Sequence, residues 1–382
     1  MPFPLRLVSL LVATCVGALV PASPAAADDH SLQRGLDALV AAPDGPPGVI
    51  VVLRDGDRQR VLTAGTADIT TGRPLEPRDH TRTASTSKAF SGAVALSLVR
   101  QHRLDLDDTI GARLPQLPRA WRSVTLRQLL QHTSGLPDYS QSPQFRSLIA
   151  ADPRRHFDSR HLLDFVAGEP LGFAPGSQYR YSNSDNIAVA LMAEAATGRL
   201  YEDLLRREVY RPLGLRDTSL PQGYEMPEPY MHGYAFGGPN GPEDVSEAIS
   251  MSGVWASGGI TSSPRDLATF IGAYAAGALT SRAAVKEQRH WIPGASEPAG
   301  PGRNSAGLAL FRYATRCGVV LGHTGNTLGY TQLIAATPDG RRALTFSLTT
   351  QVNQSGNPAL LSKLRAVEED AVCSLLGGTY GS

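Results

Sequence analysis

The sequence Ser-Thr-Ser-Lys at 85–88 combines a nucleophile with a base. It opens a strongly helical pattern, so residues three apart share a helix face and the Lys88 amine is expected beside the Ser85 hydroxyl. A serine hydroxyl is a weak nucleophile at neutral pH. An amine can take its proton only if burial or nearby cations lower the amine pKa from about 10.4. The helix N-terminus would add N–H groups where an oxyanion forms. This pair favours nucleophilic attack on a carbonyl carbon.

Taken alone, Ser-x-x-Lys is weak evidence, because a capped helix with an exposed lysine has the same pattern. The amino-acid composition favours a catalytic role for Lys88 over an exposed structural lysine. The chain has 3 lysines against 33 arginines. A position that keeps lysine can reflect the need for an amine that loses its proton, which arginine does not do.

Two later motifs supply further polar groups. Tyr181 and Asn183 belong to a Tyr-Ser-Asn sequence before a helical pattern, and His323 and Thr324 belong to a His-Thr-Gly sequence after a strand-like one. Each is an ordinary helix cap or turn when taken singly. Their order after Ser85 predicts that all three motifs contribute to one site.

The sequence lacks the motifs that indicate other hydrolases, metal sites or nucleotide cofactors. The chain has no Gly-x-Ser-x-Gly, no His-Glu-x-x-His and no glycine-rich nucleotide-binding sequence, so we expect neither a metal nor a cofactor. The charge is balanced at +1, which argues against a nucleic-acid partner, and 42% hydrophobic residues argue against a disordered chain.

Residues 1–27 are predicted to be a secretory signal peptide. Arg6 provides a positive start, 7–20 are apolar and Ala-Ala-Ala at 25–27 is a small-residue cleavage site. The apolar run is shorter than the roughly 20 residues of a membrane-spanning helix, so we expect a secreted, extracellular protein without a membrane anchor. The alternative is a retained N-terminal anchor.

Removal of the signal leaves two cysteines, Cys317 and Cys373. In an oxidising compartment we expect them to form a disulfide, which would close a long loop. Two buried free thiols are the alternative.

The remaining pattern predicts a sheet formed by both ends of the chain and a helical insertion. Strand-like segments flank Asp-Gly turns, which suit hairpins and antiparallel pairing. Helical spacing dominates the middle. We expect a sheet lobe from 28–95 and 300–382 and a mainly helical lobe from 96–299. The expected strands are 49–54, 60–63, 308–313, 319–322, 330–336 and 343–348. The expected helices are 31–41, 88–102, 126–131, 159–167, 184–197, 201–208, 266–276 and 359–375.

With these motifs, the chain resembles the penicillin-recognising serine hydrolases, in particular the secreted Streptomyces-type D-alanyl-D-alanine carboxypeptidases and class C β-lactamases. The resemblance extends to Gln-His-Thr-Ser-Gly-Leu at 131–136, Pro-Leu-Gly-Leu at 212–215, Val-Trp-Ala at 254–256 and the segment 317–342. It implies an α+β protein with the serine β-lactamase/DD-peptidase fold. In that fold helices flank an antiparallel sheet and an all-α lobe is inserted.

The resemblance also implies roles for the motif residues. Ser85 would be the acylated nucleophile, Lys88 the base or proton shuttle, and Tyr181 the general base and then the acid for the leaving amine. Asn183 would bind a substrate amide. The remaining implied site residues are His323 with Thr324 as the opposite wall, and the N–H groups of Ser85 and Asn326 as the oxyanion hole.

Two positions depart from the family pattern. Asn326 stands where close relatives have threonine. The arginine expected to bind a substrate carboxylate falls on Phe311, with Arg312 next to it. If Arg312 reaches the pocket near Trp255, a terminal D-alanine carboxylate would bind; otherwise an ester, an amide or a longer peptide is the expected substrate. The alternative for Trp255 is a core aromatic.

The resulting expectation is a monomeric serine-type D-Ala-D-Ala carboxypeptidase that acts on peptidoglycan stem peptides through an acyl-enzyme, with transpeptidation as a further activity. β-Lactams would be inhibitors. The alternatives are a β-lactamase, or an esterase, D-amino-acid peptidase or acyltransferase of the same family. A non-catalytic peptidoglycan sensor is a further alternative, against which Ser85, Lys88 and Tyr181 argue because a binder needs no paired base.

Overall fold

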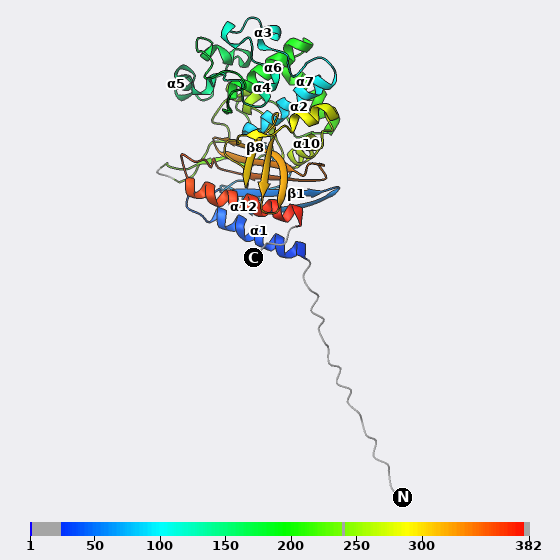
Figure 1. Ribbon diagram of the computed structural model, residues 1–382. Coiled ribbons are helices and arrows are strands. Elements are labelled where there is room, and N and C mark those ends of the chain that lie inside the picture. Colours follow the sequence, from blue (N-terminus) through cyan, green and yellow to red (C-terminus); the bar gives the residue numbers. More distant parts are fainter. Residues whose placement is uncertain (2–23, 239–240, 378–382) are drawn as a thin grey trace.

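A central antiparallel sheet separates a pair of terminal helices from a larger helical part (Figure 1). The computed structural model describes residue 1 and residues 24–238 and 241–377. Residues 2–23 of the predicted signal peptide lie outside the described residues. In the part of the chain described, no helix has the length and apolar character to cross a membrane.

The sheet has eight strands in the order β2-β1-β12-β11-β10-β9-β8-β7, and every neighbouring pair is antiparallel. Two short ladders, β3–β6 and β4–β5, lie apart from it. The strands are β1 (Gly48–Asp55), β2 (Arg58–Gly65), β3 (Thr81–Arg82), β4 (Tyr234–Ala235), β5 (Glu243–Asp244), β6 (Thr261–Ser262), β7 (Ile292–Pro293), β8 (Arg303–Ala306), β9 (Phe311–Thr315), β10 (Gly318–Thr327), β11 (Tyr330–Ala336) and β12 (Arg342–Leu348).

The helices are α1 (Pro24–Val40), α2 (Ser87–Arg100), α3 (Ile110–Arg113), α4 (Leu126–Leu130), α5 (Pro143–Ala151), α6 (Asn183–Thr197), α7 (Tyr201–Leu205), α8 (Arg211–Leu213), α9 (Trp255–Gly258), α10 (Pro264–Ala276), α11 (Arg282–Gln288) and α12 (Pro358–Leu376). Shorter 3₁₀ segments are η1 (Ala84–Thr86), η2 (Arg119–Trp121), η3 (Tyr139–Gln141), η4 (Ser159–Val166) and η6 (Met251–Gly253), and η5 (Arg206–Tyr210) is a π-helix.

The sheet is buried on both faces because its strands alternate between two apolar clusters. In β1, Val49 and Val51 pack in the cluster that includes the apolar faces of α1 and α12, whereas Ile50 and Val52 pack in a cluster on the opposite face. This follows from the period of two along a strand. The predicted antiparallel sheet with flanking helices is therefore confirmed.

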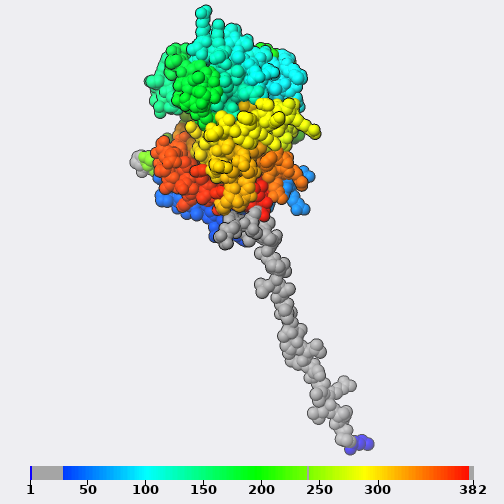
Figure 2. All heavy atoms as spheres, viewed as in Figure 1, coloured from blue at the N-terminus to red at the C-terminus, as the bar shows by residue number. Residues whose placement is uncertain are grey.

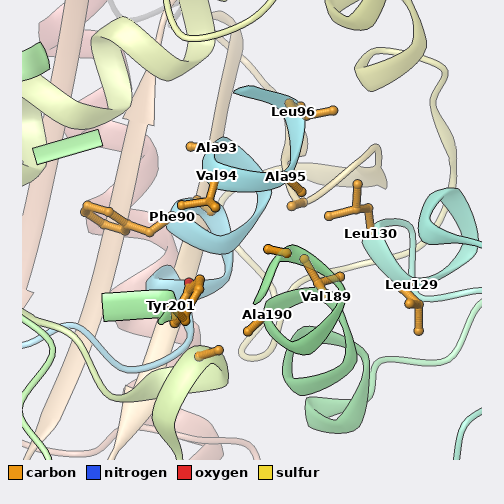
Figure 3. Close-up of a cluster of buried hydrophobic side chains, with 14 of the residues drawn as sticks. Phe90, Ala93, Val94, Ala95, Leu96, Leu129, Leu130, Val189, Ala190 and Tyr201 are labelled. Atoms are coloured by element: carbon orange, nitrogen blue, oxygen red, sulfur yellow. The ribbon is translucent and has the colours of Figure 1, made fainter. Parts of the chain in front are cut away.

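The helical part is built around α2, which is buried along most of its length. Small and apolar side chains of α2, such as Ala93 and Val94, pack with Val189 and Ala190 of α6 (Figure 3). A helix that is apolar on all sides is typical of a protein core. The core therefore holds α2 rigidly, and with it the Ser-x-x-Lys segment at its start.

Most predicted elements are present with shifted ends. The strand predicted at 330–336 has those bounds, and the strand predicted at 319–322 extends to Thr327 as β10, so the whole His-Thr-Gly motif is part of a strand. The segment predicted as a helix at 159–167 is the 3₁₀ segment η4. The lobe boundaries remain a prediction. Helix α10, in the range predicted for the helical lobe, packs against β11 and β12. In Figure 2 the yellow-green to yellow part of the chain, which includes this range, lies between the cyan and green part and the red and blue part.

The predicted disulfide is confirmed: Cys317, which directly precedes β10, is bonded to Cys373 of α12, 56 positions further along the chain. Closing a loop of that length restricts the unfolded chain, which in the loop-entropy model stabilises the fold by about 4 kcal/mol. We expect the double substitution Cys317→Ala with Cys373→Ala to lower the free energy of unfolding by about 2–4 kcal/mol. Urea denaturation of the oxidised protein and the variant measures this, and equal midpoints would contradict it.

Candidate active site

Ser85 lies in η1, in the turn that leads into α2, and it is partly exposed to a cleft. The preceding residue, Ala84, has a φ of 49°, which is uncommon for a residue with a side chain. Such a conformation persists only where the surrounding structure imposes it. The turn presents the Ser85 hydroxyl at the start of a rigid helix.

Gly325 of the His-Thr-Gly motif allows β10 to approach this turn. A Cβ at position 325 would lie 2.4 Å from the carbonyl oxygen of Thr83 and 3.1 Å from the backbone nitrogen of Ser85. No larger residue fits there without displacing backbone. The glycine therefore brings Asn326, the next residue of β10, to the nucleophile, where the predicted oxyanion hole requires it.

The Lys88 amine is fully buried and sits among three oxygen atoms. Its Nζ is 3.1 Å from Ser85 Oγ, 2.8 Å from Asn183 Oδ1 and 2.7 Å from the carbonyl oxygen of Ser257. The last two oxygens can only accept hydrogen bonds. An uncharged amine would donate its two hydrogens to them and direct its lone pair at the serine hydroxyl. This is the geometry of a base that takes the Ser85 proton.

Burial also adjusts the charge of this amine. Desolvation lowers the pKa of Lys88 to about 7, although the negative charges of Asp138 and Glu297 oppose the shift. A lysine in water stays protonated at neutral pH, with a pKa near 10.4. At pH 7 a substantial fraction of Lys88 is therefore unprotonated and able to act as a base.

Asn183 is held by protein groups on both sides of its amide. Besides accepting from Lys88, it donates through Nδ2 to Asp138 Oδ2 at 3.1 Å and to Ser140 Oγ at 3.0 Å. Its backbone N–H also donates to Asp138. The resemblance implied that Asn183 binds a substrate amide. In the structure its amide accepts from the Lys88 amine and the residue lines the cleft, so substrate binding by Asn183 stays a prediction.

Tyr181 faces both members of the nucleophile–base pair. The Lys88 Nζ lies 4.9 Å from the centre of its ring, and its hydroxyl is buried with no hydrogen-bond partner among the described residues. Burial raises the pKa of Tyr181 well above its usual value, while the nearby Ser85 hydroxyl acts in the opposite direction. The phenol therefore keeps its proton and is suited to donate it.

Behind Tyr181 lies a buried pair, His132 and Asp185. The rings of His132 and Tyr181 are 4.5 Å apart, and His132 Nδ1 is 2.7 Å from Asp185 Oδ2. Ser134 donates to the other carboxyl oxygen. Burial raises the pKa of Asp185 and lowers that of His132 to about 3, so neither group favours its charged form. The pair fixes the position of the Tyr181 ring without placing a charge behind it.

Three residues of β10 next to Gly325 differ in whether they line the cleft. His323 is buried, with Nδ1 at 2.6 Å from the Thr324 carbonyl oxygen and its ring 6.4 Å from that of Tyr181. Burial lowers the pKa of His323 to about 3, so it is neutral. Neither His323 nor Thr324 is among the residues that line the cleft, whereas Asn326 is. The imidazole therefore supports Tyr181 from behind rather than forming the opposite wall.

Two predicted binding residues are outside the cleft. Trp255 is fully buried, packs 5.3 Å from the ring of Tyr201 and donates through Nε1 to Glu202 at 2.9 Å. It is the core aromatic that the sequence left as an alternative. Arg312 lies on β9 and does not line the cleft, and the neighbouring Phe311 is buried against His323, with ring centres 5.0 Å apart. The role of Arg312 in binding a substrate carboxylate stays a prediction.

The cleft has a volume of about 1120 Å³ and runs between the helical part and the sheet. Sequence reasoning missed Ser257, Asp138 and Glu297. Asp138 had a local signal, since it caps η3, but its bond to Asn183 depends on a distant segment. The carbonyl of Ser257 and the cleft position of Glu297 have no sequence signal. No group of three or more metal-ligating side chains occurs in the described ranges.

Comparison with known proteins agrees with this geometry. The family model described as Beta-lactamase matches residues 36–368. Penicillin-binding protein 4* of Bacillus subtilis is 27% identical over 58% of this chain and 51% of its own length. A D-aminopeptidase of Cereibacter sphaeroides is 32% identical over 54% of this chain and 39% of its own. The chain thus spans about half or less of these curated relatives.

Solved structures match over more of their length. A D-stereospecific amidohydrolase from Streptomyces sp. has a TM-score of 0.74 and 30% identity, covering 84% of this chain and 94% of its own. The D-amino acid amidase from Ochrobactrum anthropi SV3, complexed with L-phenylalanine amide, has a TM-score of 0.79 and 25% identity, covering 91% and 99%.

Fold and site together define a penicillin-recognising serine hydrolase. The chain belongs to the Beta-lactamase family.

Proposed function

We propose that the protein hydrolyses amide bonds whose acyl group is a D-amino acid, through an acyl-enzyme on Ser85. The observation that carries the proposal is the Ser85–Lys88–Tyr181 arrangement, in which Ser85 and Tyr181 line the cleft and the Lys88 amine is buried against Ser85. Similarity to a D-stereospecific amidohydrolase and a D-amino acid amidase supports this substrate class.

The contacts of Lys88 with Ser85 and with the Tyr181 ring support the following proton transfers. As Ser85 Oγ attacks the carbonyl carbon, its proton passes to the unprotonated Lys88 amine 3.1 Å away. The N–H groups of Ser85 and Asn326 receive the oxyanion. The Tyr181 phenol donates its proton to the leaving nitrogen, the C–N bond breaks, and the proton on Lys88 restores the phenol. Water then attacks the ester carbonyl and loses its proton to the same base, which returns a proton to Ser85 Oγ as the C–O bond breaks and the acid leaves.

This assignment predicts a pH dependence. Because the pKa of Lys88 is lowered to about 7, the amine is protonated and inactive below that value and free above it. We expect kcat/KM to rise about tenfold per pH unit below 7 and to level off above about pH 8. A pH profile with an uncharged ester substrate measures this. A rise that continues to pH 10 would show that the base keeps the pKa of an ordinary lysine.

Substrate choice is tested by comparing three compounds: D-phenylalanine amide, its L-enantiomer, and diacetyl-Lys-D-Ala-D-Ala. We expect kcat/KM to be highest for the D-amide, with at least a tenfold preference over the L-amide. Faster release of D-alanine from the peptide would instead favour the D-Ala-D-Ala carboxypeptidase expected from the sequence. That second candidate is favoured by the similarity to a penicillin-binding protein. In either case β-lactams would acylate Ser85.

We also propose that the protein is exported. The predicted signal peptide at 1–27 and the bond between Cys317 and Cys373 support this, because disulfides persist in oxidising compartments. Sequencing the N-terminus of protein from culture medium should give Asp28 as the first residue.

A further inference from the structure

One wall of the cleft is the segment 295–299, which is fastened to the elements that carry the catalytic motifs. The hydroxyl of Tyr179, two residues before the catalytic tyrosine, donates to the carbonyl oxygen of Ala295 at 2.5 Å. The buried Ser296 hydroxyl lies 2.9 Å from that of Tyr313 on β9. The segment is thus fixed at the catalytic centre from two directions.

The next residue, Glu297, faces the cleft. Ser296 points into the protein, and the Thr324 hydroxyl of β10 donates to the carbonyl oxygen of Pro298 at 2.5 Å. Between these two anchors, the Glu297 side chain is exposed and lines the cleft. Its backbone is therefore held in place while its carboxylate is open to a ligand.

The Glu297 carboxylate has no direct contact partner in the described part of the chain. Within residues 24–238 and 241–377, no hydrogen bond or ion pair involves the Glu297 side chain, and among the described lining residues it is the one acid. The nearby Asp138 differs, because Asn183 and Ser140 saturate it. The guanidinium of Arg365, also in the cleft, donates to the carbonyl oxygens of Gly300 and Gly302.

The carboxylate is also close enough to the reacting groups to act on them. The negative charge of Glu297 favours the protonated form of Lys88 and of Tyr181. A cation bound by Glu297 would occupy the same cleft as the Ser85 hydroxyl, because both residues line it. In an α-amino acyl compound the nitrogen is two bonds from the carbonyl carbon that Ser85 attacks, so its binding site must also lie in this cleft.

We propose that Glu297 binds the free α-ammonium group of the D-amino acyl substrate and so selects substrates with an unblocked N-terminus. The proposal rests on the proposed function and makes it more specific. An N-acylated amino acid would lose this interaction, because its nitrogen is uncharged.

The substitution Glu297→Gln tests the proposal with the paired substrates D-phenylalanine p-nitroanilide and its N-acetyl derivative. We expect the variant to lose about 10- to 100-fold in kcat/KM for the free amine, mainly through a higher KM, because a charged hydrogen bond is lost. The N-acetyl compound should change less than threefold. Glu297→Lys should reduce turnover of the free amine further, because like charges repel.

Glu243→Gln, at an exposed position outside the cleft, is the matched control and should behave as wild type. Unchanged thermal unfolding of Glu297→Gln would show that its fold is intact. If the variant lost both substrates equally, or neither, the Glu297 assignment would be overturned while the proposed function stood. If wild type turned over neither anilide, the proposed function would fail and the assignment with it.

Discussion

The substitution Ser85→Ala should abolish hydrolysis, with a loss in kcat of about 10⁴-fold or more. The Ser85 hydroxyl is partly exposed to the cleft and lies 3.1 Å from the Lys88 amine, and no other hydroxyl among the described residues shares that contact. Without the Oγ atom no acyl-enzyme can form. Initial rates with a D-amino acid p-nitroanilide measure the loss.

Ser147→Ala is a suitable control, because this serine is exposed on α5 and does not line the cleft. It should retain wild-type rates. Ser85→Ala should still bind substrate, since the cleft walls are unchanged. Residual turnover above about 1% of wild type would identify another nucleophile and contradict the mechanism.

The substitution Lys88→Met should lower kcat by roughly 10²- to 10⁴-fold, the usual contribution of a positioned base. Methionine fills a similar volume but cannot accept the Ser85 proton. Removal of the buried ionisable amine stabilises the variant, and loss of its hydrogen bonds to Asn183 and Ser257 destabilises it, so we expect the two effects largely to offset each other. Steady-state rates and urea denaturation together separate loss of chemistry from loss of fold.

Lys88→Arg should be as inactive as Lys88→Met, since a guanidinium keeps its proton. Lys286→Met, at an exposed position on α11, serves as the control and should leave the rate unchanged. If Lys88→Met kept more than a tenth of the wild-type rate, Tyr181 or another group would have to be the base.

The sequence predicted the parts of the site that depend on local periodicity. Spacing of three on a helix places Lys88 beside Ser85, and the structure has this contact. Strand alternation and Asp-Gly turns predicted the antiparallel sheet, and cysteine count with an expected oxidising compartment predicted the Cys317–Cys373 bond. These features need little information from distant segments.

The parts that could not be predicted depend on tertiary packing. Tryptophan is a residue type that often binds ligands. The burial of Trp255 against Tyr201, however, follows from how α9 packs near α7. Asn183 carries both a donor and an acceptor, and only the fold decides that Lys88 and Asp138 engage them. Glu297 is one of many acids in the chain, and only its place in the cleft distinguishes it.

The central claim is that Ser85 becomes acylated by a D-amino acid. Wild-type protein mixed with a D-phenylalanine ester and quenched in acid within milliseconds should show, by intact mass spectrometry, a mass increase of one phenylalanyl group. Tryptic mapping should place it on Ser85 within peptide 83–88, and the L-ester should give far less adduct. An unmodified protein, or an adduct on any other residue, would contradict the claim.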